Sequence, residues 1–227
     1  MQQNTQNLWE DSYKNGENIL FYPHNELVRF LNRFIKKQIS LDSFENIYSN
    51  KEREREREIR ALDFGCGSGR QTLLLSQFDI EAYGIDISQT AINNAESLAN
   101  TLKLKAKFLA NTSDKIPFED NFFDFSISCG VLNCMPFSLS MHYLNELARV
   151  SKKYCFLILN GKSSNEISYT LKNGDIFNPL VFKSNKNNIN KMLQNSPFTL
   201  KWGEAIEHKN LLNNSKSIYY ALVLEKA

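Results

Sequence analysis

The chain has 227 residues, of which 42% are hydrophobic and 23% charged, so it can form one domain with a normal buried core. Its formal net charge of +2 argues against a dedicated nucleic-acid-binding protein, which usually carries a concentrated basic surface. No apolar run approaches the roughly 18 residues that a membrane span needs. The polar beginning also lacks the apolar core of a signal peptide. We therefore expect a cytoplasmic protein whose partners include neither nucleic acid nor membrane.

The four cysteines indicate reduced core thiols rather than a metal site. They lie in or beside apolar runs and show no paired C-x-x-C spacing, so zinc is not expected. They are Cys66, Cys129, Cys134 and Cys155.

Residues 1–58 are expected to form a helical lid and a linker. Pro23 suits a helix start, and apolar residues recur at helical spacing through FYPHNELVRFLNRFIKK, residues 21–37. The segment ends in the run KEREREREIR, residues 51–60. As a helix this run places like charges four residues apart, and as a strand it has no apolar face. A solvated linker is the expected structure.

From Ile59 onward the pattern changes to alternating strands and helices. The expected strands are 61–64, 81–87, 105–110, 123–129 and 154–160, and the expected helices are 70–78, 88–103 and 138–152. Residues 161–195 are polar and irregular, with a short helix near 186–194, and residues 198–208 and 218–227 suggest a closing hairpin.

Repeated strand–helix units imply a parallel sheet with helices on both faces. We predict a single Rossmann-like α/β domain over 59–227, with a mostly parallel seven-stranded sheet and a C-terminal antiparallel hairpin. Residues 161–195 are expected to be an insertion on the substrate side.

The segment ALDFGCGSGR, residues 61–70, runs from a buried strand through three glycines into a helix. Glycine permits positive φ angles and a close approach of the backbone to a ligand, and the helix start offers free N–H groups to an anion. The dinucleotide pattern G-x-G-x-x-G would need a glycine where the chain has Arg70. NAD is therefore expected to bind poorly.

Asp86 ends the next predicted strand, in YGIDIS. A carboxylate at that position can accept hydrogen bonds from both hydroxyls of a ribose. The alternative is a simple cap for the following helix, but Ser88 is better placed for that role.

Over about residues 59–160, the sequence resembles the class I S-adenosylmethionine (SAM)-dependent methyltransferases, specifically the group that acts on small molecules. The matching motifs, in order, are LDFGCGSG, YGIDIS, DKIPFEDNFFDFSIS and ELARVSK followed by an apolar strand. The resemblance implies SAM as the cofactor and S-adenosylhomocysteine (SAH) as the product.

The resemblance also implies which residues contact the cofactor. They are Asp63, Gly65, Cys66, Gly67, Cys129 and Gly130 on the methionine side, Asp86 at the ribose, and Ile87, Thr112 and Ser113 at the adenine. Thr112 departs from the acidic residue that is common there, so adenine recognition rests on its hydroxyl, on Asn111 or on backbone. Tyr22 and Arg29 are candidates for the methionine carboxylate or an anionic substrate; the alternative is helix-start packing and a solvated face.

The nucleophile-activating group is not evident in the motifs. Many relatives have a histidine just after the fourth strand, where this chain has VLNCMP with Asn133 and Cys134. The candidates are His24 in the N-terminal segment, His208 in the hairpin, and Asn133, whereas His142 is expected at the surface. Trp9 and Tyr13 are candidates for a lid.

The chain lacks the Asn-Pro-Pro-Tyr, Asp-Pro-Pro-Tyr and Pro-Cys motifs of DNA-base methyltransferases. This favours methylation of an oxygen or nitrogen atom of a small metabolite. The pattern YP-N-E-LVRFL looks like bacterial enzymes that modify surface-glycan precursors. Strict Glu-Arg alternation is also what a slippage-prone GA dinucleotide repeat would encode, which suits a gene switched on and off. We hypothesise a sugar or phosphorylated precursor as the acceptor. The alternatives are a catalytically silent SAM-binding regulatory partner and a protein or RNA methyltransferase.

Overall fold

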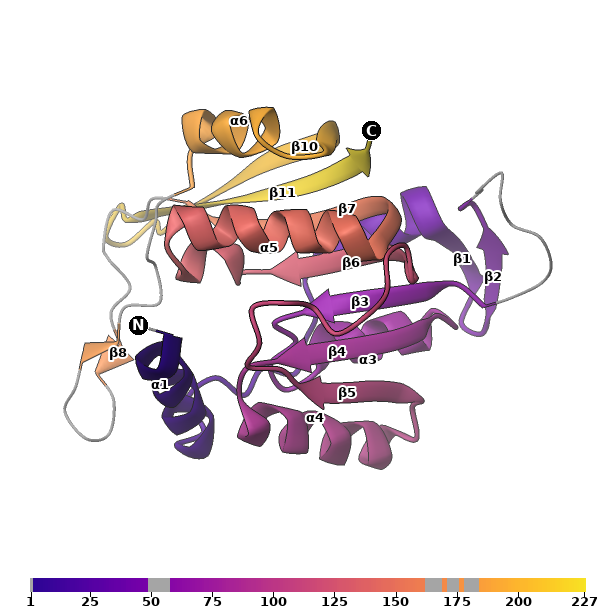
Figure 1. Ribbon diagram of the computed structural model, residues 1–227, viewed down its shortest axis with the longest axis horizontal. Helices are drawn as coiled ribbons and strands as arrows, with labels where there is room; N and C mark the ends of the chain where they lie inside the picture. The colour runs from indigo at the N-terminus through magenta and orange to yellow at the C-terminus, as the bar shows by residue number, and fades with distance from the viewer. Residues whose placement is uncertain (1, 49–57, 162–168, 171–175, 178–183) are drawn as a thin grey trace.

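The computed structural model describes residues 2–48, 58–161, 169–170, 176–177 and 184–227. Its centre is a seven-stranded sheet in the order β10-β11-β7-β6-β3-β4-β5 (Figure 1). The strands are β3 (Arg60–Phe64), β4 (Glu81–Asp86), β5 (Ala106–Ala110), β6 (Phe123–Cys129), β7 (Ser151–Asn160), β10 (Phe198–Lys209) and β11 (Lys216–Lys226). Strands β3 to β7 pair in parallel, while β11 pairs antiparallel with both β7 and β10. The predicted Rossmann-like sheet and closing hairpin are confirmed.

Helices cover both faces of the sheet, as the alternating side chains of the buried strand β7 require. Phe156 and Ile158 belong to one apolar cluster, and Leu157 and Leu159 to the other. Helices α2 (Asn25–Phe30) and α3 (Arg70–Gln77) pack into the first cluster, and α5 (Phe137–Val150) and α6 (Lys186–Gln194) into the second. Helix α4 (Gln89–Leu102) packs on β4 and β5.

The N-terminal segment differs from its expected form. Helix α1 (Gln2–Lys14) precedes the predicted lid helix, and the pattern over 21–37 gives only α2, a π-helical turn at Leu31–Ile35, and then β1 (Lys36–Ser40). Strand β1 pairs with β2 (Ser43–Asn46) in a separate small sheet. The backbone becomes extended at Lys36, whose buried ammonium lies 2.8 Å from the carboxylate of Asp79, and the other residues of β1 are exposed.

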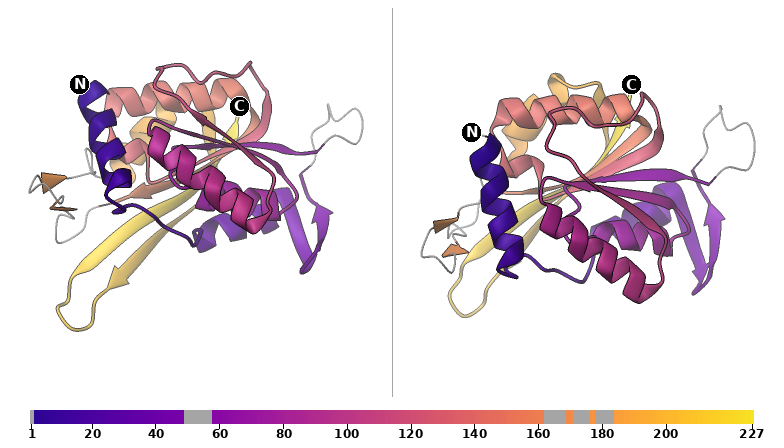
Figure 2. Two further views of the ribbon diagram at one scale, coloured as in Figure 1. Left: turned by 90° about the horizontal axis from the view of Figure 1, so that it is seen from below. Right: turned by 60° about the horizontal axis from the view of Figure 1, so that its bottom comes forward.

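The carboxyl ends of β3, β4, β5 and β6 point to the side of the molecule where α1 lies (Figure 1). The β10–β11 hairpin extends beyond the body of the domain in two further views (Figure 2). Within the described residues, no helix combines the length and apolarity that crossing a membrane would need. Most of the Glu-Arg run, at 51–57, lies outside the described residues. Of residues 161–195, the structure describes Gly161, two short strands (β8, Tyr169–Thr170; β9, Ile176–Phe177) and the part from 184 onward.

Candidate functional site

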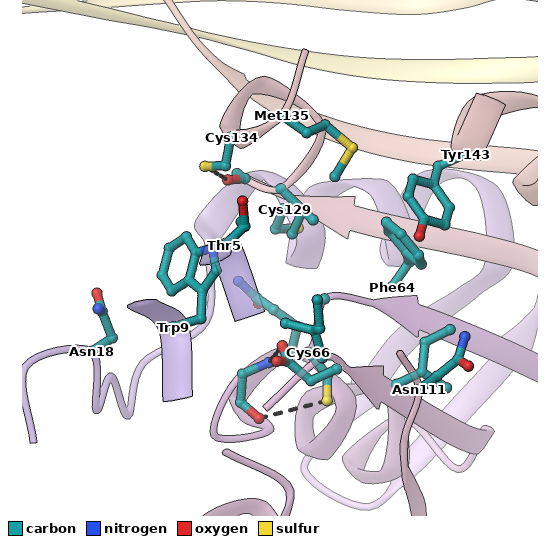
Figure 3. A pocket seen from close by; sticks show the side chains of 18 of the residues that line it. Thr5, Trp9, Asn18, Phe64, Cys66, Asn111, Cys129, Cys134, Met135 and Tyr143 are labelled. Atoms are coloured by element: carbon teal, nitrogen blue, oxygen red, sulfur yellow. Dashed lines mark hydrogen bonds between the residues drawn. The ribbon is translucent and has the colours of Figure 1, made fainter. Parts of the chain in front are cut away.

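A cavity of about 770 Å³ opens at the carboxyl edge of the parallel strands. Its lining comes from α1, the glycine loop after β3, the end of β4, residues 111–113, the end of β6 and the start of α5 (Figure 3). Ligands of open α/β sheets bind at this edge, where the loops after the strands meet. The predicted residues that line it are His24, Gly65, Cys66, Gly67, Asp86, Ile87, Thr112, Ser113, Cys129 and Gly130.

The glycine loop adopts backbone conformations in which a residue with a side chain would be strained or would clash with its neighbours. Gly67 has φ +53°, and a β-carbon there would overlap the hydroxyl of Tyr13 from α1. Gly69 has φ +84° and is the N-cap residue just before α3. The start of α3 therefore lies beside the cavity, where Arg70 and Gln71 line it.

Asp86, at the end of the neighbouring strand β4, contacts the glycine loop. Its Oδ2 accepts a hydrogen bond from the Gly67 amide at 2.8 Å, and its Oδ1 accepts one from the Ser88 amide at 2.9 Å. Burial raises the pKa of Asp86, although these amides favour the carboxylate. Each carboxylate oxygen keeps a further lone pair for a ligand hydroxyl. The helix cap is Ser88, whose Oγ accepts from the Ala91 amide at 3.1 Å, so Asp86 is not needed for that role.

Asp63 lies beneath the loop rather than on the cavity surface. It is 1% exposed, accepts a hydrogen bond from Thr72 Oγ1 at 2.7 Å, and is absent from the described lining. Burial raises its pKa to about 7. Its contact with Thr72 ties β3 to α3, which positions the loop between them.

Arg70 occupies the first position of α3 and lines the cavity. One terminal nitrogen donates to the Tyr22 carbonyl at 2.9 Å, and the other lies 3.3 Å from His24 Nε2. Because a guanidinium is only a donor, His24 Nε2 accepts and the imidazole is neutral. Burial and the nearby Arg70 charge both lower the pKa of His24.

Two buried donors beside Arg70 lack a partner among the described residues. They are Ser68 Oγ and Gln71 Nε2, both of residues that line the cavity. The other end of the Gln71 amide accepts from the His24 amide at 3.2 Å, which fixes its orientation. Both atoms are buried away from the cavity surface, so a ligand could reach them only after the two side chains move.

The sequence pattern did not single out this group of Arg70, Ser68 and Gln71. A signal was present, because Arg70 stands where a dinucleotide-binding loop has its third glycine. An arginine at the first position of the helix brings a cation to the same place that the helix N-terminus makes attractive for anions.

Besides Asp63, four predicted residues do not line the described cavity. Tyr22 is 85% exposed. Arg29 forms a bidentate ion pair with Glu204 at 2.7 and 2.8 Å and lies over the Trp202 ring.

His208 stacks on Tyr219 along the exposed strand β10, with 5.6 Å between ring centroids. Asn133 is fully buried, and its Oδ1 accepts from the Asn160 amide at 3.1 Å. It therefore anchors the loop after β6 to the end of β7.

Helix α1 contributes Thr5, Trp9 and Tyr13 to the lining. In the close-up, Thr5 and Trp9 lie toward Cys134 and Cys129, away from Asn111 (Figure 3). The hydroxyl of Tyr13 lies against Gly67, and burial raises the pKa of Tyr13 above its usual value.

Residues 111–113 form the side of the cavity next to Ile87. The Asn111 side chain is held at both ends, since its Nδ2 donates to the Lys115 carbonyl at 3.2 Å and its Oδ1 accepts from the Ser113 amide at 3.2 Å. His142 lies outside the described lining and bonds the Asp114 carbonyl through Nε2 at 2.7 Å. Throughout the described part of the chain, no three or more His, Cys, Asp or Glu residues group in a way that could hold a metal ion.

The central part of the chain is similar in sequence to known methyltransferases. Residues 62–159 match the family described as "Methyltransferase domain". The chain is 32% identical over 97 residues to the uncharacterized methyltransferase YcgJ of Bacillus subtilis (strain 168), covering 42% of this chain and 38% of that protein. It is 25% identical over 154 residues to the putative methyltransferase GWCH70_2453 of Geobacillus sp. (strain WCH70), covering 66% of this chain and 58% of that protein. These matches span less than two thirds of either relative.

Among solved structures, a SAM-dependent methyltransferase of Methanosarcina mazei superimposes with a TM-score of 0.64 at 20% identity. The superposition covers 76% of this chain and 94% of that one. At this identity the likeness concerns the fold. Residues 62–159 thus resemble a methyltransferase domain in sequence, and the chain shares its fold with the Methanosarcina mazei structure.

Proposed function

We propose that this chain is a SAM-dependent methyltransferase that transfers a methyl group to an oxygen or nitrogen atom of a small metabolite. One observation carries the proposal: the glycine loop before α3 and the Asp86 carboxylate at the end of β4 line the same cavity and contact each other. A ligand with a ribose and an anionic group at suitable separation satisfies both.

The chemistry of the lining fits SAM in its three parts. The Arg70 guanidinium, at the start of α3, suits the methionine carboxylate. Asp86 suits the ribose hydroxyls. Residues 111–113 and Ile87 also line the cavity, and we place the adenine beside them.

When bound, SAM supplies a methyl group already activated by a positively charged sulfur. The residues of this chain then have mainly to hold donor and acceptor in line and to keep water out. Helix α1 covers the cavity with Trp9 and Tyr13 and serves the second purpose. An oxygen acceptor also needs a proton acceptor. His24 is the candidate inside the cavity, because its Nε2 lone pair becomes free when Arg70 turns toward a carboxylate.

Calorimetry with SAM, SAH and NAD tests cofactor binding. We expect both sulfur compounds to bind and NAD to bind poorly; absence of SAM and SAH binding would overturn the proposal. Mass-spectrometric detection of SAH, across a panel of hydroxyl- and amine-bearing metabolites, tests the reaction. SAM binding without SAH formation from any of them would favour a silent regulatory partner. Label transfer from methyl-labelled SAM to protein or RNA would favour a macromolecular substrate.

A finer form of this proposal makes the acceptor a sugar or phosphorylated precursor of a bacterial surface polysaccharide. It depends on the YP-N-E-LVRFL pattern and on the Glu-Arg alternation. The coding DNA tests the second argument. A GA dinucleotide tract would support it, and mixed Glu and Arg codons would remove it.

A further inference from the structure

The cavity is lined by two chemically different regions. The charged lining residues, Arg70 and Asp86, both contact the glycine loop or the segment that packs on it. The opposite region, here called the acceptor wall, consists of Thr5, Trp9, Cys134, Met135 and Leu139. In the close-up, Cys134 and Met135 lie across the space from Cys66, and Trp9 lies at the side of that space, below Thr5 (Figure 3).

The acceptor wall carries no charged side chain. Among the described lining residues, Arg70 and Asp86 are the two that are charged near pH 7, because His24 is held neutral by its contact with the Arg70 guanidinium. The Cys134 thiol donates to the Gly130 carbonyl at 3.0 Å, and burial raises its pKa to about 12, so it is not a thiolate. The remaining wall residues are apolar or hold a single hydroxyl.

The two charged groups are already matched by the proposed cofactor. Arg70 suits the methionine carboxylate and Asp86 the ribose, which leaves no counter-ion for the second molecule on the described surface. The cavity volume of about 770 Å³ lies in the upper part of the range of about 300–1,000 Å³ that is usual for ligand sites, so a second molecule has room.

We propose, resting on the methyltransferase function above, that the acceptor presents an uncharged apolar group, preferably an aromatic ring, to the acceptor wall. A phosphate or carboxylate placed there would lose its hydration without gaining an ion pair, which is strongly unfavourable. Trp9 contributes an aromatic ring to the lining, and Met135 contributes a flexible, polarizable side chain that adapts to the shape of a ligand. A phosphorylated acceptor is compatible only when its phosphate stays outside the wall.

A matched pair of probes tests this inference. Naphthylamine and an aminonaphthalene sulfonate share the ring and the amine and differ by one fixed negative charge. Both are titrated into protein saturated with SAH, and binding is followed by the fluorescence of Trp9 in a Trp202→Phe background. Trp202 lies on the hairpin and is absent from the cavity lining, so Trp9 becomes the sole tryptophan reporter.

We expect the neutral probe to bind at least about tenfold more tightly than the sulfonate. Met135→Lys should narrow or reverse this preference by supplying the missing counter-ion. Leu200→Lys is the matched control, since Leu200 is 49% exposed on β10 and outside the lining, and it should leave the preference unchanged. By calorimetry, Trp9→Ala should weaken the neutral probe about tenfold and leave SAH within about threefold.

Equal or tighter binding of the sulfonate to the wild-type chain would overturn the inference, as would binding of neither probe to the SAH complex. SAH binding is measured first, by calorimetry. Its absence would overturn the proposed function itself, so the two failures are distinguishable.

Discussion

The carboxylate of Glu10, on α1, accepts hydrogen bonds from both the hydroxyl and the backbone amide of Thr90, at 2.5 and 3.2 Å. The same carboxylate accepts a third from Ser88 Oγ at 2.6 Å. Ser88 and Thr90 lie just beyond Asp86, so the first helix of the chain is fastened beside the predicted ribose position. Helix α1 is thereby held over the cavity.

Replacing Glu10 with alanine should loosen α1. Loss of these hydrogen bonds should weaken SAH about fivefold, because each bond to a partly exposed carboxylate is worth about 1 kcal/mol. It should also make Trp9 more accessible to acrylamide, measured by quenching in the Trp202→Phe background. Glu17→Ala is the control, since Glu17 accepts from Ser12 Oγ rather than from α4. Equal quenching in the Glu10→Ala variant and its parent would contradict the fastening role.

The same contact should give a pH dependence. Burial by itself raises the pKa of Glu10, but hydrogen bonds from Ser88 and Thr90 outweigh it and lower the pKa from 4.5 to about 2. A lowered pKa stabilises the folded arrangement above pH 4.5, and this contribution is lost as the pH falls from 4.5 toward 2. Trp9 fluorescence should change across this window in the parent chain and much less in the Glu10→Gln variant.

Asp86→Ala should weaken SAM binding by about 1–3 kcal/mol, because two ribose hydroxyls lose their acceptor. Calorimetry measures the affinity, and thermal unfolding separates this effect from loosening of the loop that Asp86 also supports. Asp42→Ala, in the distant turn between β1 and β2, should have no effect on affinity. Wild-type affinity in the Asp86 variant would refute the ribose assignment.

Arg70→Ala should reduce SAH affinity about tenfold or more, since hydrogen bonds between charged groups are worth about 1.5–3 kcal/mol. Methylthioadenosine, which lacks the methionine carboxylate, should bind both variants within about twofold. Arg29→Ala tests the earlier sequence-based candidate and should leave SAH affinity unchanged, because Arg29 is engaged by Glu204. An equal loss for both ligands in the Arg70 variant would contradict the carboxylate role.

Gly67→Ala should lower the free energy of unfolding by about 2 kcal/mol. Part of the loss comes from the positive φ angle, which costs about 1–2 kcal/mol for a residue with a β-carbon, and part from overlap with the Tyr13 hydroxyl. In the double variant with Tyr13→Phe, the nearest described atom is a ring carbon at 3.4 Å, so about 1 kcal/mol should return. Urea unfolding of the four proteins measures this coupling, and strict additivity would count against the contact.

His24→Ala and His208→Ala should behave differently. His208 lies on the exposed hairpin, and its loss should keep turnover within about twofold, whereas loss of His24, the candidate proton acceptor, should lower kcat for an oxygen acceptor at least about tenfold. Since the pKa of buried His24 is lowered from 6.5, the unfolded chain binds more protons below that pH, and stability should fall as the pH drops below 6.5. Removing His24 should flatten that part of the stability profile.

The strands of the parallel sheet and the glycine loop were predictable because their signals are contiguous in the sequence. A strand, a glycine loop and a helix follow one another within residues 61–78, and the apolar runs of the later strands are equally local. The location of Asp86 follows from the parallel pairing of β3 with β4, which places consecutive strand ends side by side.

The ion pair that keeps Arg29 away from the cavity could not be predicted from the sequence. The partner residue Glu204 lies 175 residues away along the chain and reaches Arg29 only because the C-terminal hairpin packs against α2. The orientation of Gln71 likewise depends on the connector before α2 folding back onto α3, where the His24 amide meets the Gln71 side chain. Local patterns contain no information on such distant contacts.

The position of Tyr13 against Gly67 has a kinetic consequence. A molecule lying on the glycine loop is partly covered by the first helix, so a movement of α1 away from Ser88 and Thr90 should speed its exchange with solvent. Under the proposed function, the residence time of the demethylated product should depend on this movement, and such motions often limit turnover more than the chemical step does. Any change that tightens the contact between α1 and α4 should retain the product longer and slow the enzyme, even as it raises affinity.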